Sequence, residues 1–160
     1  MLDCVTREEV IATSPEALWA ALTEPDQVAR WFGDTAEIDL RVGGTVRFGW
    51  PAGEVSKGVV TAVEPGKIFA FKWDVFGTIT DPGSFTHVEF RLHRVDGGTA
   101  VRVLETGLET LHATGVAPDP EELFEEHIDG WRNEMSDLVD YLEGRTRLPE
   151  DAMHDSRLKT

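Results

Sequence analysis

The side chains that could carry chemistry in this sequence are few, and they gather in its second half. Arg102 and Glu105 lie three residues apart in a segment of alternating polarity, so at most one of them can face inward. A buried charge would need a partner, which makes either residue a pocket candidate. His127 lies on the apolar face of a later helical segment, where it could bond a ligand or accept a proton from a substrate. The alternative is a structural histidine whose hydrogen bonds are made within the protein.

Familiar catalytic and metal-binding patterns are not found in the sequence. It has no Gly-x-Ser-x-Gly, no phosphate-binding glycine loop, no Gly-x-Gly-x-x-Gly and no histidine pair at i and i+4. His87 and His93 share one face of a strand, but the rise of six strand residues separates them by roughly 20 Å, too far for one metal ion. Cys4 is the only cysteine, so an internal disulfide and a cysteine metal cluster are excluded. We predict no catalytic residue, no metal and no cofactor.

Aromatic side chains offer a second kind of chemistry, the binding of an apolar molecule. The chain has 5 tryptophans and 8 phenylalanines, and many fall on the inward side of alternating or helical patterns. They could line a pocket, which in proteins is mostly apolar with a few placed polar groups; ordinary core is the alternative. The predicted ligand-binding residues are Phe48, Trp50, Phe71, Trp73, Val88, Phe90, His127, Trp131 and Met135.

Composition limits the partners. A chain of 160 residues is the usual size of one domain. A net charge of -15 would repel nucleic acid and anionic lipid, so neither nucleic acid nor membrane is an expected partner. The sequence starts with MLDCVTREEVIATS, which has no basic leader, and no later stretch has the roughly 20 apolar residues that span a bilayer. We expect a cytoplasmic protein, and a homodimer is a common state for such domains.

The spacing of apolar residues predicts the elements that position these candidates. Residues 5–12 alternate as a strand, Ser14-Pro15-Glu16 caps a helix, and a second short helix follows the break at Pro25. Six further strands are predicted over residues 35–42, 45–50, 58–63, 68–74, 85–95 and 99–106. In the first of these strands we expect the side chains of Ile38, Leu40 and Val42 to be buried on one face. A hairpin turn is predicted to follow at Gly43-Gly44. Residues 76–83 are predicted to be a loop.

A long amphipathic helix completes the pattern. It is predicted from about Pro120 to Leu142, with apolar residues every three or four positions. It is the one segment long and apolar enough to cover a sheet face, so the seven strands should curl around it. We predict an α+β domain over residues 1–144, followed by a polar tail over residues 145–160.

The assembled segments resemble a known family. They are IATSPEALWAALTEPDQVARWFG, VGGTVRFGW, GVVTAVEPGKIFAFKWD, SFTHVEFRLHRVDGGTAVRVLETGL and GWRNEMSDLVDYLEG. Over about residues 5 to 144 they are similar to bacterial homologues of the activator of heat-shock protein 90 ATPase. That family is part of the START-like (SRPBCC) superfamily, which includes lipid-transfer domains, birch-pollen-type allergens and polyketide aromatase/cyclases.

The resemblance implies a helix-grip fold with a cavity between the sheet and the long helix. The leading hypothesis is therefore noncatalytic binding of a small hydrophobic or aromatic ligand there. An alternative is a co-chaperone that stimulates the heat-shock protein 90 ATPase. Another is an enzyme of aromatase/cyclase type, in which His127, Arg102 or Glu105 would move protons.

We predict that the protein alone does not raise the ATPase rate of a bacterial heat-shock protein 90. The resemblance is to the START-like part, and 160 residues would leave no room for the separate N-terminal domain with which eukaryotic activators dock. A coupled ATPase assay with increasing protein tests this expectation. Stimulation that saturates with protein concentration would contradict it and favour the co-chaperone hypothesis.

Overall fold

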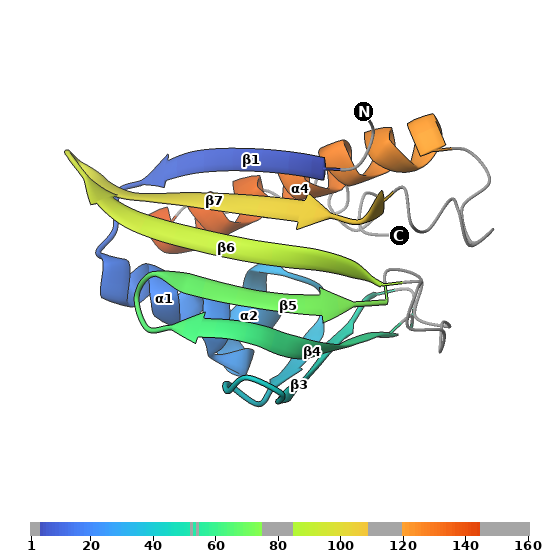
Figure 1. Ribbon diagram of the computed structural model, residues 1–160. Helices are drawn as coiled ribbons and strands as arrows, with labels where there is room; N and C mark the ends of the chain where they lie inside the picture. The colour runs from blue at the N-terminus through green and yellow to red at the C-terminus, as the bar shows by residue number, and fades with distance from the viewer. Residues whose placement is uncertain (1–3, 52, 54, 75–84, 109–119, 145–160) are drawn as a thin grey trace.

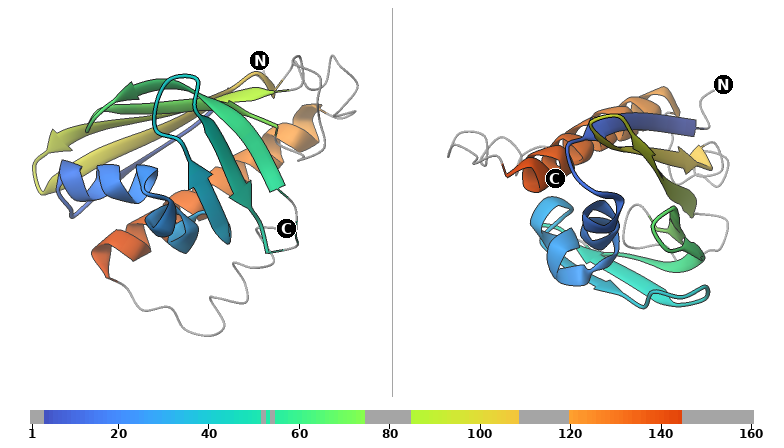
Figure 2. Two further views of the ribbon diagram at one scale, coloured as in Figure 1. Left: turned by 90° about the horizontal axis from the view of Figure 1, so that it is seen from below. Right: turned by 90° about the vertical axis from the view of Figure 1, so that its left-hand side faces the viewer.

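A curved antiparallel sheet of seven strands, with helices on its concave side, makes up the structure (Figures 1 and 2). The computed structural model describes residues 4–51, 53, 55–74, 85–108 and 120–144. The predicted loop 76–83 and the predicted tail 145–160 lie outside the described residues. The elements are β1 (Cys4–Ile11), α1 (Pro15–Thr23), α2 (Pro25–Trp31), β2 (Thr35–Ile38), β3 (Thr45–Gly49), β4 (Val55–Glu64), β5 (Ile68–Trp73), β6 (Thr86–Val95), β7 (Gly98–Thr106) and α4 (Pro120–Glu143).

The strands follow one another as a meander, except that the first strand closes the far edge. The order across the sheet is β1-β7-β6-β5-β4-β3-β2, and every neighbouring pair is antiparallel. Alternation sorts the side chains, so that in β6 Val88, Phe90 and Leu92 are buried while Arg91 is exposed. The predicted seven-stranded α+β architecture is confirmed.

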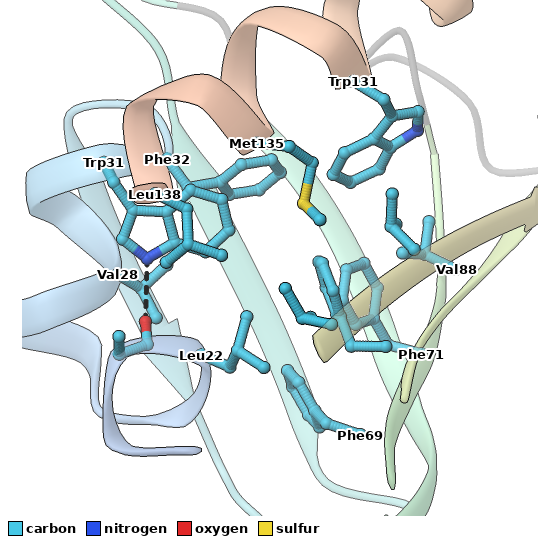
Figure 3. Packing of buried hydrophobic residues seen from close by; sticks show 14 of the residues in the cluster. Leu22, Val28, Trp31, Phe32, Phe69, Phe71, Val88, Trp131, Met135 and Leu138 are labelled. Atoms are coloured by element: carbon cyan, nitrogen blue, oxygen red, sulfur yellow. Dashed lines mark hydrogen bonds between the residues drawn. The ribbon is translucent and has the colours of Figure 1, made fainter. Parts of the chain in front are cut away.

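The two short helices begin where capping signals predict. Ser14 accepts a hydrogen bond from the Ala17 backbone N–H at 3.1 Å, and proline occupies the first position of both α1 and α2. The Trp31 indole N–H at the end of α2 donates to the Ala21 carbonyl in α1 at 2.8 Å (Figure 3). This buried bond holds the two helices together.

Helix α4 lies across the concave side of the sheet and packs on β1, α1 and α2 (Figure 2). Trp131, Met135 and Leu138 recur at helical spacing and are buried. They point toward Phe71 and other side chains of the sheet (Figure 3). None of the described helices is long and apolar enough to cross a membrane.

One strand prediction is wrong. Strand β2 ends at Ile38, and Leu40 and Val42 are exposed rather than buried. The chain turns earlier than the glycine pair indicates, because the Arg41 backbone N–H donates to the Asp39 carbonyl and Gly44 N–H donates to the Arg41 carbonyl, both at 2.8 Å. A Cβ at Gly44 would lie 2.1 Å from the Asp39 carbonyl oxygen, so only glycine allows this tight turn.

We predict that Leu138→Ala lowers the free energy of unfolding by about 2–5 kcal/mol, because it leaves a cavity at a fully buried position of α4. Leu40→Ala is the matched control. It removes the same atoms from a turn where the side chain is 39% exposed, and it should cost about 0.5 kcal/mol or less. Urea unfolding followed by circular dichroism measures both. Equal losses in the two variants would contradict the packing described for α4.

Candidate functional site

A buried carboxylate, that of Glu105 on β7, is the most unusual feature of the molecule. Its side chain is 0% exposed. Oε2 accepts hydrogen bonds from the Thr86 hydroxyl at 2.6 Å and the Trp73 indole N–H at 3.2 Å. Oε1 accepts a bond from the Trp131 indole N–H at 3.0 Å and is paired with Nδ1 of His127. Both carboxylate oxygens are therefore fully satisfied by protein groups.

Sheet register and helical spacing bring these groups together. Trp73 and Thr86 face each other across β5 and β6, and the Trp73 indole N–H also donates to the Thr86 hydroxyl at 3.0 Å. Glu105 faces Val88 across β6 and β7, so it lies next to Thr86 on the same side of the sheet. His127 and Trp131 are four residues apart on α4 and reach the same oxygen from above.

The local electrostatics favour an ion pair between Glu105 and His127. Burial alone would raise the pKa of Glu105, but the positive charge of His127 and hydrogen bonds from His127, Thr86 and Trp131 hold that pKa below its usual value. Burial alone would lower the pKa of His127, but the charge and hydrogen bond of Glu105, together with the charge of Glu126, raise it. The imidazolium and carboxylate forms stabilise each other.

An aromatic layer surrounds the pair on its apolar side. Phe32, at the end of α2, is its centre: its ring centroid lies 5.7 Å from those of both Trp73 and Trp131, with planes within 21° and 10° of parallel. Phe48 and Trp50 meet Phe32 edge-on at 5.1 and 5.0 Å. The rings are in van der Waals contact, so at this level they fill the space between the sheet and α4.

The predicted ligand-binding residues all belong to this region. Trp50 and His127 are half-buried. The buried ones are Phe48, Phe71, Trp73, Val88, Phe90, Trp131 and Met135. Ring contacts join most of them, such as Phe90 with Trp131 at 5.8 Å. The structure thus brings the predicted set together, while their role toward a ligand stays a prediction.

Arg102 and Glu105, the two candidates on β7, lie on opposite faces of the strand, as their odd spacing requires. Glu105 faces inward and Arg102 is exposed, so Arg102 takes no part in the site. Two participants were not among the predicted residues. Thr86 is a polar residue on the inward side of β6, and the alternation of polar and apolar residues in that strand could have identified it. Phe32 follows a short helix, where spacing alone does not show which way the ring points.

A concavity lies away from the Glu105–His127 pair, at the opposite end of β5 and β6. It has a volume of about 670 Å³ and is lined by Pro15 of α1, the β4–β5 turn with Lys67, and residues 91–94 of β6. It contains none of the predicted ligand-binding residues. Among the described residues, no three His, Cys, Asp or Glu side chains come close enough to hold a metal ion.

Comparison with known proteins agrees with the architecture. A family model described as Activator of Hsp90 ATPase homolog 1-like protein matches residues 12–143. The crystal structure of protein MLL2253 from Mesorhizobium loti superposes with a TM-score of 0.73 at 28% identity, covering 91% of this chain and 99% of that one. No curated protein matches the sequence.

Two more distant structures share the fold. The Aha1 dimer from Colwellia psychrerythraea has a TM-score of 0.73 at 21% identity, covering 90% of this chain and 98% of that one. DynU16, a putative protein of the dynemicin biosynthetic locus, has a TM-score of 0.73 at 23% identity. This chain is covered to 88% in that match, and DynU16 to 47%.

We predict that the Glu105–His127 pair limits stability at both ends of a pH window. Its contribution is complete between about pH 4.5 and 6.5, the usual pKa values of the two groups. Above 6.5 the unfolded chain loses the histidine proton that the folded protein keeps, so stability falls by up to about 1.4 kcal/mol per pH unit until the raised pKa of His127 is passed. Below 4.5 the unfolded chain takes up a proton on Glu105 before the folded protein does, so stability falls there too.

Urea unfolding from pH 4 to 9 tests this dependence. The His127→Gln variant should lack the alkaline loss that the pair causes in the wild-type protein, while both proteins still fold. An alkaline loss of the same size in the variant would show that His127 is not the group responsible.

Proposed function

The chain belongs to the family of Activator of Hsp90 ATPase homolog 1-like proteins, and from this premise we propose that it is a noncatalytic binding protein. Its ligand would be a small hydrophobic or aromatic molecule held between the sheet and α4. The observation that carries the proposal is the aromatic layer that ends at the Glu105–His127 pair. Such a surface offers apolar area together with one polar group, as small-molecule sites usually do.

Net stabilisation of the fold accounts poorly for an ion pair, rather than apolar side chains, at this position. Burying two charges costs several kcal/mol of desolvation per ion, and apolar replacements of similar volume are often neutral or stabilising. The rings around the pair could pack without it, because Phe48 and Trp50 each contact Phe32 directly. Apolar side chains could supply comparable stability, so we infer that the pair also serves recognition.

The expected affinity follows from the area that a ligand would bury. A bicyclic aromatic ligand that buries roughly 150 Å² of apolar surface gains about 4 kcal/mol, less the cost of association. It must also part rings that now touch, such as Trp73 and Trp131 with centroids 6.2 Å apart. Micromolar affinity would thus require more buried area or a hydrogen bond, and His127 is the polar group that can supply it.

A second candidate function is an enzyme of aromatase/cyclase type, and the same ion pair favours it. A protonated imidazole beside a carboxylate can donate a proton to a bound substrate. Incubation of a bound ligand with the protein, followed by chromatography, separates the two functions. A ligand recovered unchanged supports binding, and a product that forms in proportion to protein and time supports catalysis.

We predict that 2-isopropenylnaphthalene, a bicyclic apolar probe, binds the protein and that Trp131→Phe weakens this binding about fivefold. The smaller ring removes about 40 Å² of contact area, which corresponds to about 1 kcal/mol. Isothermal titration calorimetry measures the affinity.

Trp19→Phe is the matched control. It makes the same change on α1, where Trp19 contacts Phe69 rather than the ion pair, and it should leave the affinity unchanged. Absence of binding to the wild-type protein would reject the proposed function for this class of ligand, and equal weakening by both variants would place the probe elsewhere.

A further inference from the structure

We propose that Glu105 is a positioning residue that fixes His127 as a hydrogen-bond donor, and that the pair selects aromatic ligands carrying a neutral oxygen acceptor such as a ketone. This inference rests on the proposed function and names the ligand class for the same site.

The first step is the orientation of the imidazole. Nδ1 of His127 is paired with Oε1 of Glu105, so a proton lies on Nδ1. In the imidazolium form that Glu105 favours, the other nitrogen, Nε2, carries the second proton and points away from the carboxylate. Within the described part of the chain Nε2 has no hydrogen-bond partner, and the His127 side chain is 16% exposed. The imidazole ring is therefore not wholly enclosed, and the proposal places the acceptor of a ligand at this nitrogen.

The second step is the rigidity of the carboxylate. Trp131 donates to the same oxygen as His127, while Trp73 and Thr86 hold the other oxygen. Rotation of the carboxylate would break bonds from β5, β6 and α4 together. Because Glu105 cannot turn, the imidazole that it holds keeps one direction, and Nε2 is preorganised for a ligand acceptor.

The third step is charge. His127 and Glu105 together carry no net charge, and among the described residues the further charge that acts on His127 is that of Glu126, also on α4. The neighbouring positions of β5 and β6 contribute Trp73 and Thr86, which are uncharged. An anionic ligand at Nε2 would approach two carboxylates across a poorly solvated site. A neutral carbonyl accepts the same hydrogen bond without that repulsion.

Three probes of one shape test the selection. They are 2-acetylnaphthalene with a neutral acceptor, 2-isopropenylnaphthalene with none, and 2-naphthoate with an anionic acceptor. At pH 6.5 we expect the wild-type protein to bind the ketone about tenfold more tightly than the alkene, the gain of a hydrogen bond to a charged donor. It should bind the carboxylate less tightly than the ketone.

Two variants separate recognition from packing. Glu105→Gln keeps the shape but removes the negative charge, so the preference for the ketone should disappear at a lower pH than in the wild-type protein. His127→Gln should reduce the preference to about twofold or less at every pH. Affinity for the alkene should stay the same in both variants, a result that a merely structural role for the pair does not predict. Circular dichroism at each pH confirms that the variants are folded.

The outcomes distinguish this inference from the function on which it rests. If the alkene binds as tightly as the ketone, the selection is wrong and the binding function stands. If naphthoate binds as tightly as the ketone or more so, the preference for a neutral acceptor is wrong. If none of the three probes binds, both proposals fail for aromatic ligands. An unchanged pH dependence in Glu105→Gln would overturn the positioning role of Glu105.

Discussion

The complete burial of the Glu105 carboxylate is the constraint on which the arrangement of the molecule depends. An ionised Glu105 with no access to water would cost many kcal/mol if its oxygens lacked partners. Donors from three other elements remove that cost, namely Trp73 of β5, Thr86 of β6, and His127 with Trp131 of α4. Each of these elements must therefore keep its place relative to β7.

Apolar packing alone would allow more freedom. The rings between the sheet and α4 could slide by a fraction of a helical turn with a modest loss of contact, since dispersion attraction has little directional preference. Hydrogen bonds to Glu105 are directional, and moving α4 along its axis would break two of them at once. The polar cluster thus sets the position of α4, while the aromatic layer supplies most of the area that α4 buries.

Strand alternation and helical spacing in the sequence predicted the parts of the structure that follow directly from these two periods. Alternation identified the seven strands, the inward face with Phe71 and Val88, and the choice between Arg102 and Glu105 as an either-or question. Helical spacing placed His127 and Trp131 on one stripe. The patterns failed where a local turn decides, as in the β2–β3 connection. There β2 ends at Ile38 rather than at the predicted residue 42, and a tight turn that requires Gly44 follows.

These two periods alone do not predict which residues form the polar cluster around Glu105. Parity shows that Glu105 and Thr86 face inward on separate strands, but only the register of β6 with β7 makes them neighbours. The contact with His127 then depends on where α4 crosses the sheet, which follows from the packing of the whole core. Phe32 illustrates the same limit, because its direction depends on the tight approach of Gly33 to the Gly49 carbonyl, where a Cβ would lie 2.6 Å away.

The distribution of burial along α4 indicates where the helix can move to admit a ligand at the lowest free energy. Trp131, Met135 and Leu138 in the middle and C-terminal part of the helix are buried, and Phe32 beneath them directly follows helix α2, which the Trp31–Ala21 bond ties to α1. Toward the N-terminus, His127 and Ile128 are only half-buried. Segments with fewer buried contacts open at lower free energy than the core does. A ring inserted beside His127 would thus disturb the less buried part of the helix, and it would meet there the one nitrogen that the carboxylate of Glu105 holds in place.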